Sequence, residues 1–226
     1  MTGSIVSAGT RERVRGMATP IATALGRLGL TPNALTVIGF LGTCVAALAA
    51  ATQWWIAAGV LVLAFGIFDL FDGTLARATG RATRLGAFLD STFDRAGEGI
   101  VFLGIAIGLV AAGFPEGGWL AAAAMGAAFM VSYARAKSES LGFTPGTGMA
   151  NVGLMPREVR IVVLGLGLML ATGPIYEAPP VNAVCGGPCD FPQGGSITAA
   201  LLIITIGSVV TTIQRVLHVR SQAKED

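Results

Sequence analysis

The sequence is poor in charged residues, which make up only 12% of its 226 residues, about half the share of a soluble domain. Hydrophobic residues account for 53%, and the mean hydropathy is +0.71. These values exclude a disordered chain, a fibrous chain and an ordinary water-soluble domain. With three cysteines and one histidine, the chain also lacks the disulfide density of a secreted scaffold and any Cys/His zinc cluster. The composition instead predicts an all-α, polytopic membrane protein.

Six apolar segments are candidates for crossing a bilayer, which takes a helix of about 20 residues. They are residues 35–51, 54–78, 85–113, 119–141, 159–171 and 196–219. The fifth is short in its purely apolar part, and its helix can begin as early as Met155. None of the 15 Lys and Arg residues lies in the three loops on one side, at 52–53, 114–118 and 172–195. Positive charge marks cytosolic loops, and only six spans place every Lys and Arg on one side. We therefore predict six transmembrane helices, and we expect them in the cell (plasma) membrane. Both termini then lie in the cytosol, and the site described below opens to the cytosolic side.

The segments flanking the spans define the expected domain organisation. Residues 11–28, which contain Pro20 and several arginines, are predicted to form an amphipathic helix on the membrane surface, and Thr31-Pro32-Asn33 a turn and helix cap. We expect a tail and juxtamembrane helix at 1–30, a six-helix domain at 31–220 and a cytosolic tail at 221–226. In the long outer loop, Cys185 and Cys189 either form a small disulfide or remain free thiols.

Four aspartates interrupt the second and third apolar segments. Each costs about 2.5–3.5 kcal/mol at the centre of a membrane helix, so such residues are functional candidates. At 100° per residue, Asp69 and Asp72 share one helix face, and Asp90 and Asp94 share a face of the next helix. A short polar turn at 79–83 joins the two helices. We therefore expect all four carboxylates to surround one point in the cytosolic half of the membrane.

Four neighbouring carboxylates raise each other's pKa unless cations separate them. Oxygen ligands select hard ions such as Mg²⁺, Mn²⁺ or Ca²⁺, and a pair of divalent ions commonly serves a phosphate-rich substrate. The predicted metal ligands are Asp69, Asp72, Asp90 and Asp94. The alternative is a set of buried ion pairs, for instance between Asp94 and Arg77.

Residues 69–94 read DLFDGTLARATGRATRLGAFLDSTFD, which fits the pattern D-x2-D-G-x2-A-R-x8-G-x3-D-x3-D. This stretch resembles the signature of the CDP-alcohol phosphotransferases. The resemblance implies an enzyme that transfers the phosphatidyl group of CDP-diacylglycerol to an alcohol and releases CMP. It further implies two Mg²⁺ or Mn²⁺ ions held by the four aspartates, with Asp94 also as general base. It assigns the CDP-lipid to Gly73, Ala76 and Arg77, and it implies a homodimer.

A second group of charges lies at the cytosolic ends of the last three spans. It comprises five cations: Arg135, Lys137, Arg157, Arg160 and Arg215. An anionic acceptor such as a polyol phosphate accounts for them, although snorkelling to lipid headgroups is the alternative for each residue. Arg157 and Arg160 share a helix face, so we predict that they form one phosphate clamp.

The motifs S-Y-x-R-x-K at 132–137, R-x-x-R at 157–160 and the pair Gln214-Arg215 are similar to those of the phosphatidylinositol phosphate synthases within this family. The similarity implies inositol 1-phosphate as the acceptor and a membrane-lipid environment, with no nucleic-acid partner. The chain departs from that group at Pro156 and Val159, where acidic residues are usual. Glycerol 3-phosphate is the alternative acceptor.

An ion-coupled transporter is the alternative class, because membrane carboxylates also mark ion pathways. The acids lie on one hairpin near one face of the membrane, and no inverted repeat is visible, which disfavours that class.

Overall fold

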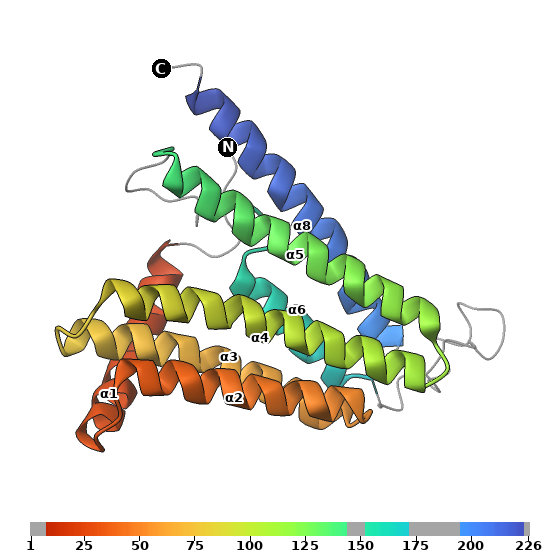
Figure 1. The fold of residues 1–226 in the computed structure, drawn as a ribbon, viewed down its shortest axis with the longest axis horizontal. Coiled ribbons are helices and arrows are strands. Elements are labelled where there is room, and N and C mark those ends of the chain that lie inside the picture. The colour runs from red at the N-terminus through yellow and green to blue at the C-terminus, as the bar shows by residue number, and fades with distance from the viewer. Residues whose placement is uncertain (1–7, 144–151, 172–194, 224–226) are drawn as a thin grey trace.

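The computed structural model describes residues 8–143, 152–171 and 195–223, and within these ranges it is all-helical, without strands. The helices, shown in Figure 1, are α1 (Ala8–Arg27), α2 (Pro32–Ala51), α3 (Trp55–Ala78), α4 (Arg84–Ala111), α5 (Pro115–Ser140), α6 (Arg157–Met169) and α8 (Gly195–Gln222). The all-α prediction is thus confirmed for the described residues. Cys185 and Cys189 lie outside them.

Local sequence signals account for where two of these helices begin. Thr31 caps α2: its Oγ1 accepts a hydrogen bond of 3.2 Å from the Ala34 N–H, and Pro32 occupies the first helical position, where its missing N–H costs nothing. Thr83 caps α4 in the same way, accepting from the Gly86 N–H at 3.0 Å. Both predicted turns, at residues 31–33 and 79–83, are therefore confirmed.

Six helices form a closed ring, in which each packs against the next in the order α3, α2, α4, α5, α8, α6 and back to α3. Although α3 and α4 are consecutive in sequence, both pack extensively on α2 and neither packs extensively on the other. Small residues allow this arrangement: a Cβ at Gly104 or Gly108 would lie 2.2 Å from the carbonyl oxygen of Ala47 or Ala50. Close approach at small residues is the usual basis of helix packing in membranes.

The helix α1 lies across one end of the ring and packs on α3. Its contact is a small apolar cluster of Ala22, Leu35 and Leu75, one residue from each of α1, α2 and α3. At this end, on the left of Figure 1, α3, α5 and α8 finish and α4 and α6 begin. The turn 79–83 and the predicted cytosolic charges therefore lie at one end of the molecule.

The outer surface of the ring is strongly apolar, with large exposed side chains such as Leu48, Val60, Leu103 and Ile206. In the described part of the chain, α2, α3, α5 and α8 are long and apolar enough to span a membrane. The other two ring helices, α4 and α6, do not meet both the length and the composition expected of a membrane span. Charged residues interrupt α4, and α6 has only 13 residues.

Candidate active site

A cavity of about 1090 Å³ lies inside the ring and is lined by residues of α3, α4, α5, α6 and α8. Its lining includes two of the predicted metal ligands, Asp90 and Asp94. It also includes four of the five predicted acceptor-binding cations, namely Arg135, Arg157, Arg160 and Arg215. The folding of the ring thus brings together acidic and basic groups that lie up to 125 residues apart in the sequence.

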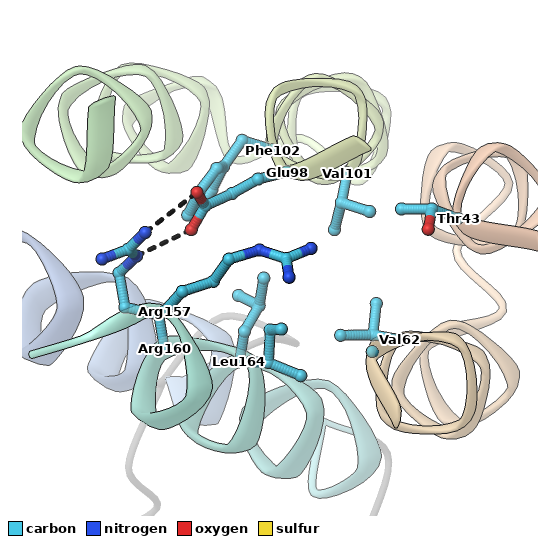
Figure 2. Close-up of a pocket in the computed structure, with 10 residues that line it drawn as sticks. Thr43, Val62, Glu98, Val101, Phe102, Arg157, Arg160 and Leu164 are labelled. Atoms are coloured by element: carbon cyan, nitrogen blue, oxygen red, sulfur yellow. Dashed lines mark hydrogen bonds and ion pairs between the residues drawn. The ribbon is translucent and has the colours of Figure 1, made fainter. Parts of the chain in front are cut away.

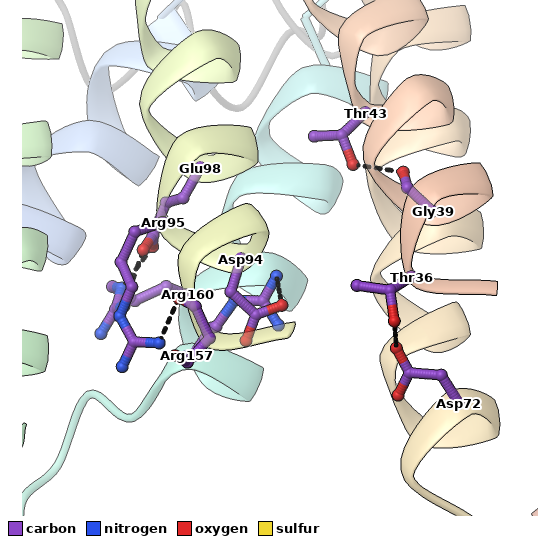
Figure 3. Close-up of polar contacts among 10 residues, drawn as sticks. Thr36, Gly39, Thr43, Asp72, Asp94, Arg95, Glu98, Arg157 and Arg160 are labelled. Atoms are coloured by element: carbon purple, nitrogen blue, oxygen red, sulfur yellow. Dashed lines mark hydrogen bonds and ion pairs between the residues drawn. The ribbon is translucent and has the colours of Figure 1, made fainter. Parts of the chain in front are cut away.

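Two ion pairs cross the ring from α4 to α6 (Figure 3). Arg157 Nη2 lies 3.2 Å from Asp94 Oδ1, with both side chains partly exposed. One turn further along both helices, Arg160 donates to Glu98 through Nε at 2.7 Å and Nη2 at 3.0 Å. The Arg160 and Glu98 side chains are only 2% and 8% exposed. Asp94 and Glu98 are four residues apart, so both project from one face of α4.

Arg157 and Arg160 share a face of α6, as the sequence predicts, but their surroundings differ. Besides its two bonds to Glu98, Arg160 donates from Nη1 to the Met155 carbonyl at 3.0 Å. Both side chains line a smaller pocket of about 40 Å³ together with Thr43 and Val62, and in it the Arg157 side chain points away from Glu98 (Figure 2). Arg157 therefore reaches toward the centre of the ring, whereas Arg160 is bound within the protein.

The other predicted acceptor residues come from α5 and α8. Arg215 is 3% exposed and donates from Nε to the Val152 carbonyl at 3.1 Å and from Nη1 to the Val131 carbonyl. Arg135 is exposed and pairs with Glu139 at 2.9 Å. Lys137 is also exposed on α5 and is not among the residues that line the cavity.

Asp72 occupies a separate, buried position at the interface of α3 and α2. It is 4% exposed, and its Oδ2 accepts a hydrogen bond of 2.7 Å from the Thr36 hydroxyl (Figure 3). Nearby on α3, the Arg77 side chain folds over Gly73, so a Cβ at Gly73 would lie 3.5 Å from Arg77 Nη1. The predicted CDP-lipid residues Gly73 and Arg77 thus lie close together, and Ala76 lies one residue before Arg77.

The side chain of Asp69 lies outside the described part of the structure. Among the side chains that are described, no three Asp, Glu, His or Cys residues are grouped closely enough to hold a metal ion. The predicted four-carboxylate site therefore stays a prediction. Its chemistry is compatible with Mg²⁺ or Mn²⁺, because it offers only oxygen donors and includes the buried carboxylate of Asp72.

Sequence reasoning missed two contacts of this region, those of Glu98 with Arg160 and of Thr36 with Asp72. The signal for Glu98 was its position, four residues after Asp94 in an otherwise apolar stretch. For Thr36 there was no comparable signal, because a threonine in a membrane helix more often bonds to its own backbone.

Comparison with known proteins identifies the family of this chain. The family model for CDP-alcohol phosphatidyltransferases matches residues 29–220. The chain is 33% identical to a phosphatidylinositol phosphate synthase of Streptomyces avermitilis, covering 92% of this chain and 79% of that one. It is 36% identical to an archaetidylinositol phosphate synthase of Pyrococcus horikoshii, covering 94% of this chain and 95% of that one.

Solved structures of Mycobacterium tuberculosis phosphatidylinositol phosphate synthase have the same fold. The complex with manganese and citrate gives a TM-score of 0.71 at 26% identity, covering 90% of this chain and 89% of that one. The structure with CDP-DAG bound gives 0.70 at 28% identity, covering 89% and 92%. The chain therefore belongs to the CDP-alcohol phosphatidyltransferase family and is a multi-pass membrane enzyme.

Proposed function

We propose that this enzyme transfers the phosphatidyl group of CDP-diacylglycerol to inositol 1-phosphate and releases CMP. The observation that carries the proposal is that Asp90 and Asp94 line the same cavity as Arg157 and Arg215. A carboxylate beside arginines suits an acceptor that carries both a hydroxyl group and a phosphate. The similarity to phosphatidylinositol phosphate synthases, and to such an enzyme with CDP-DAG bound, supports the same reaction.

In the proposed reaction, a hydroxyl oxygen of the acceptor forms a bond to the phosphorus that carries the diacylglycerol. The bond from that phosphorus to the bridging oxygen breaks, and CMP leaves with that oxygen and its electron pair. Asp94 accepts the hydroxyl proton as general base. Because Arg157 contacts Asp94 at 3.2 Å, a phosphate bound to Arg157 would hold the rest of the acceptor next to this carboxylate.

Asp69, Asp72, Asp90 and Asp94 would hold divalent metal, Mg²⁺ or Mn²⁺, as two ions. Bound metal of this kind neutralises a diphosphate and stabilises charge on the leaving nucleotide. The likeness to a structure in complex with manganese supports this assignment. Gly73, Ala76 and Arg77 bind the cytidine and phosphates of the lipid, with the guanidinium of Arg77 as a phosphate partner.

The remaining basic residues extend the acceptor site. Arg135, Lys137 and Arg215 lie at the same end of the ring as Arg157 and keep the local charge positive, which attracts a phosphorylated alcohol. Arg160 acts through Glu98, to which it is bound, and not by direct contact with the acceptor. The free alcohol, inositol, has no anionic group to pair with these cations. We therefore expect a phosphorylated acceptor to be required.

The membrane arrangement follows the distribution of charge. The six ring helices, which together make up a domain at 31–220, span the plasma membrane, and the segments 1–30 and 221–226 remain in the cytosol. The helix α1 lies on the membrane surface, and the cavity opens to the cytosol, where the polar acceptor is available. The active form is a homodimer.

An acceptor panel tests this function. Purified enzyme in lipid nanodiscs would receive CDP-diacylglycerol and Mg²⁺ or Mn²⁺ with inositol 1-phosphate, glycerol 3-phosphate or free inositol, and CMP release would be measured. We expect rapid release with inositol 1-phosphate alone, and none after chelation of the metal. Faster CMP release with glycerol 3-phosphate would show that it, and not inositol 1-phosphate, is the acceptor. The absence of CMP with every phosphorylated alcohol would contradict the transferase reaction.

A further inference from the structure

We propose that Glu98 is a positioning residue that holds the acceptor-binding side chains in place from one helical turn below them. This inference rests on the proposed function, because it assigns Asp94, Arg157 and Arg215 to the reaction. It concerns a set of contacts that we call the polar joint, made by Glu98 of α4, Arg160 of α6, Met155 before α6, and Thr211 of α8.

The polar joint connects three helices through consecutive hydrogen bonds. Arg160 binds Glu98 through Nε and Nη2, and its Nη1 donates to the Met155 carbonyl at 3.0 Å. The Met155 N–H donates to Thr211 Oγ1 at 2.9 Å. The chain of contacts therefore runs from α4 through α6 to α8, and Figures 2 and 3 show its first link.

The placement of α4 relative to α6 depends on side chains. These helices are not neighbours in the ring, since α4 packs on α2 and α5, and α6 packs on α3 and α8. Their relative position is fixed indirectly, by the helices between them and by side chains that meet in the interior. The two ion pairs are polar contacts made directly between α4 and α6. A shift of either helix would move Asp94 away from Arg157.

Three proposed active-site side chains each lie one helical turn from a member of the polar joint. Asp94 precedes Glu98 by four residues, Arg157 precedes Arg160 by three, and Arg215 follows Thr211 by four. Because α8 runs in the direction opposite to α4 and α6, all three displacements point to the same end of the ring. The polar joint thus forms a layer one helical turn deeper in the ring than Asp94, Arg157 and Arg215.

Burial distinguishes the two ion pairs that join α4 to α6. Arg160 and Glu98 are 2% and 8% exposed and share two hydrogen bonds, whereas Arg157 and Asp94 are 28% and 18% exposed. Inside a membrane protein, a buried charge that loses its partner is strongly unfavourable. The pair of Arg160 and Glu98 is therefore fixed, whereas Arg157 and Asp94 can leave each other to bind the acceptor and the metal.

The test must separate positioning from mere stabilisation. Glu98→Gln keeps the shape of the side chain and removes its charge. The double variant Glu98→Leu with Arg160→Met removes both charges together, and proteins often tolerate such a replacement of a buried ion pair by apolar residues. Glu116→Gln is the matched control, because this exposed glutamate lies in the first turn of α5, at the opposite end of the ring. Each full-length variant would be purified in nanodiscs and checked for a monodisperse, folded state.

Three measurements would follow, namely the KM for inositol 1-phosphate, the Kd for CDP-diacylglycerol, and hydrogen exchange in the first turn of α6. We expect the acceptor KM to rise roughly tenfold to a hundredfold in Glu98→Gln and in the folded double variant. The lipid Kd should stay within about twofold, because α3 carries the proposed CDP-lipid residues. Exchange in α6 should accelerate, and Glu116→Gln should match the wild type throughout.

A folded double variant with the wild-type acceptor KM, beside an active wild type, would overturn the positioning role and leave the proposed function intact. If the wild-type enzyme releases no CMP with any phosphorylated alcohol, the proposed function is wrong. Accelerated hydrogen exchange at the start of α6 in Glu98→Gln would then still support the polar joint. Unchanged hydrogen exchange there would overturn the polar joint together with the proposed function.

Discussion

Arg157 contacts Asp94 across the interior of the helix ring, with Nη2 and Oδ1 3.2 Å apart. The proposed phosphate-binding side chain and the proposed general base are therefore partners before any substrate arrives. Each offsets the charge of the other at a site that is only partly exposed. A metal ion can take the place of the guanidinium beside Asp94, and an acceptor phosphate can take the place of the carboxylate beside Arg157.

Asp94→Asn should abolish turnover while leaving CDP-diacylglycerol binding largely intact. The amide cannot accept the acceptor proton, so kcat should fall by about 10²–10⁴-fold. CMP release and calorimetric binding of the lipid in nanodiscs would be measured on the same preparation. Loss of metal and nucleotide binding, instead of turnover alone, would reassign Asp94 to metal ligation without a role as base.

Arg157→Ala should raise the KM for inositol 1-phosphate about tenfold or more and spare CDP-diacylglycerol binding, since it removes a charge-assisted bond to the acceptor. Initial rates of CMP release at varied acceptor concentration provide the measurement. Arg220→Ala is the matched control, because this exposed arginine lies in the last turn of α8. Unchanged acceptor kinetics in Arg157→Ala would return this side chain to an anchoring role.

Thr36→Val should weaken metal binding if Asp72 is a ligand. The substitution removes the 2.7 Å hydrogen bond that orients this buried carboxylate, and such outer contacts typically contribute about 10–100-fold in metal affinity. Thr36→Ser keeps the hydroxyl and should retain most of the affinity. Mn²⁺ binding, followed by electron paramagnetic resonance without substrate, gives a readout independent of turnover; equal affinity in all three proteins would argue against a metal at Asp72.

Gly104→Ala should destabilise the ring, because its Cβ would lie 2.2 Å from the Ala47 carbonyl oxygen. Overpacking of this kind costs about 1–3 kcal/mol, which should lower the midpoint of thermal unfolding in detergent. Gly126→Ala is the control, since a Cβ there meets nothing within 4 Å. A Gly104→Ala protein as stable as the control would show that α2 and α4 can separate without cost.

Several features of the fold could be predicted from local sequence. The apolar segments and the turn at 79–83 correspond to helices and a connection in the structure, because length, periodicity and capping act within a few residues. The aspartate motif identified the family for a similar reason, since its residues lie within one helical hairpin. The same periodicity placed Arg157 and Arg160 on a common face of α6.

The neighbours of each helix were beyond the reach of that reasoning. Periodicity tells which residues share a face, but it does not tell which other helix that face meets. Thus α2 lies between α3 and α4 along one side, Arg160 is bound by Glu98, and Arg215 donates to two backbone carbonyls.

The sequence by itself therefore determined the helices, the charge asymmetry between their ends and the acidic motif, all of which depend on residues close together in the chain. Only the tertiary structure decided the order of the ring and the partners of its buried charges. The reason is physical: small residues such as Gly104 allow close packing with any complementary helix, and the partner is selected only when all six helices pack together.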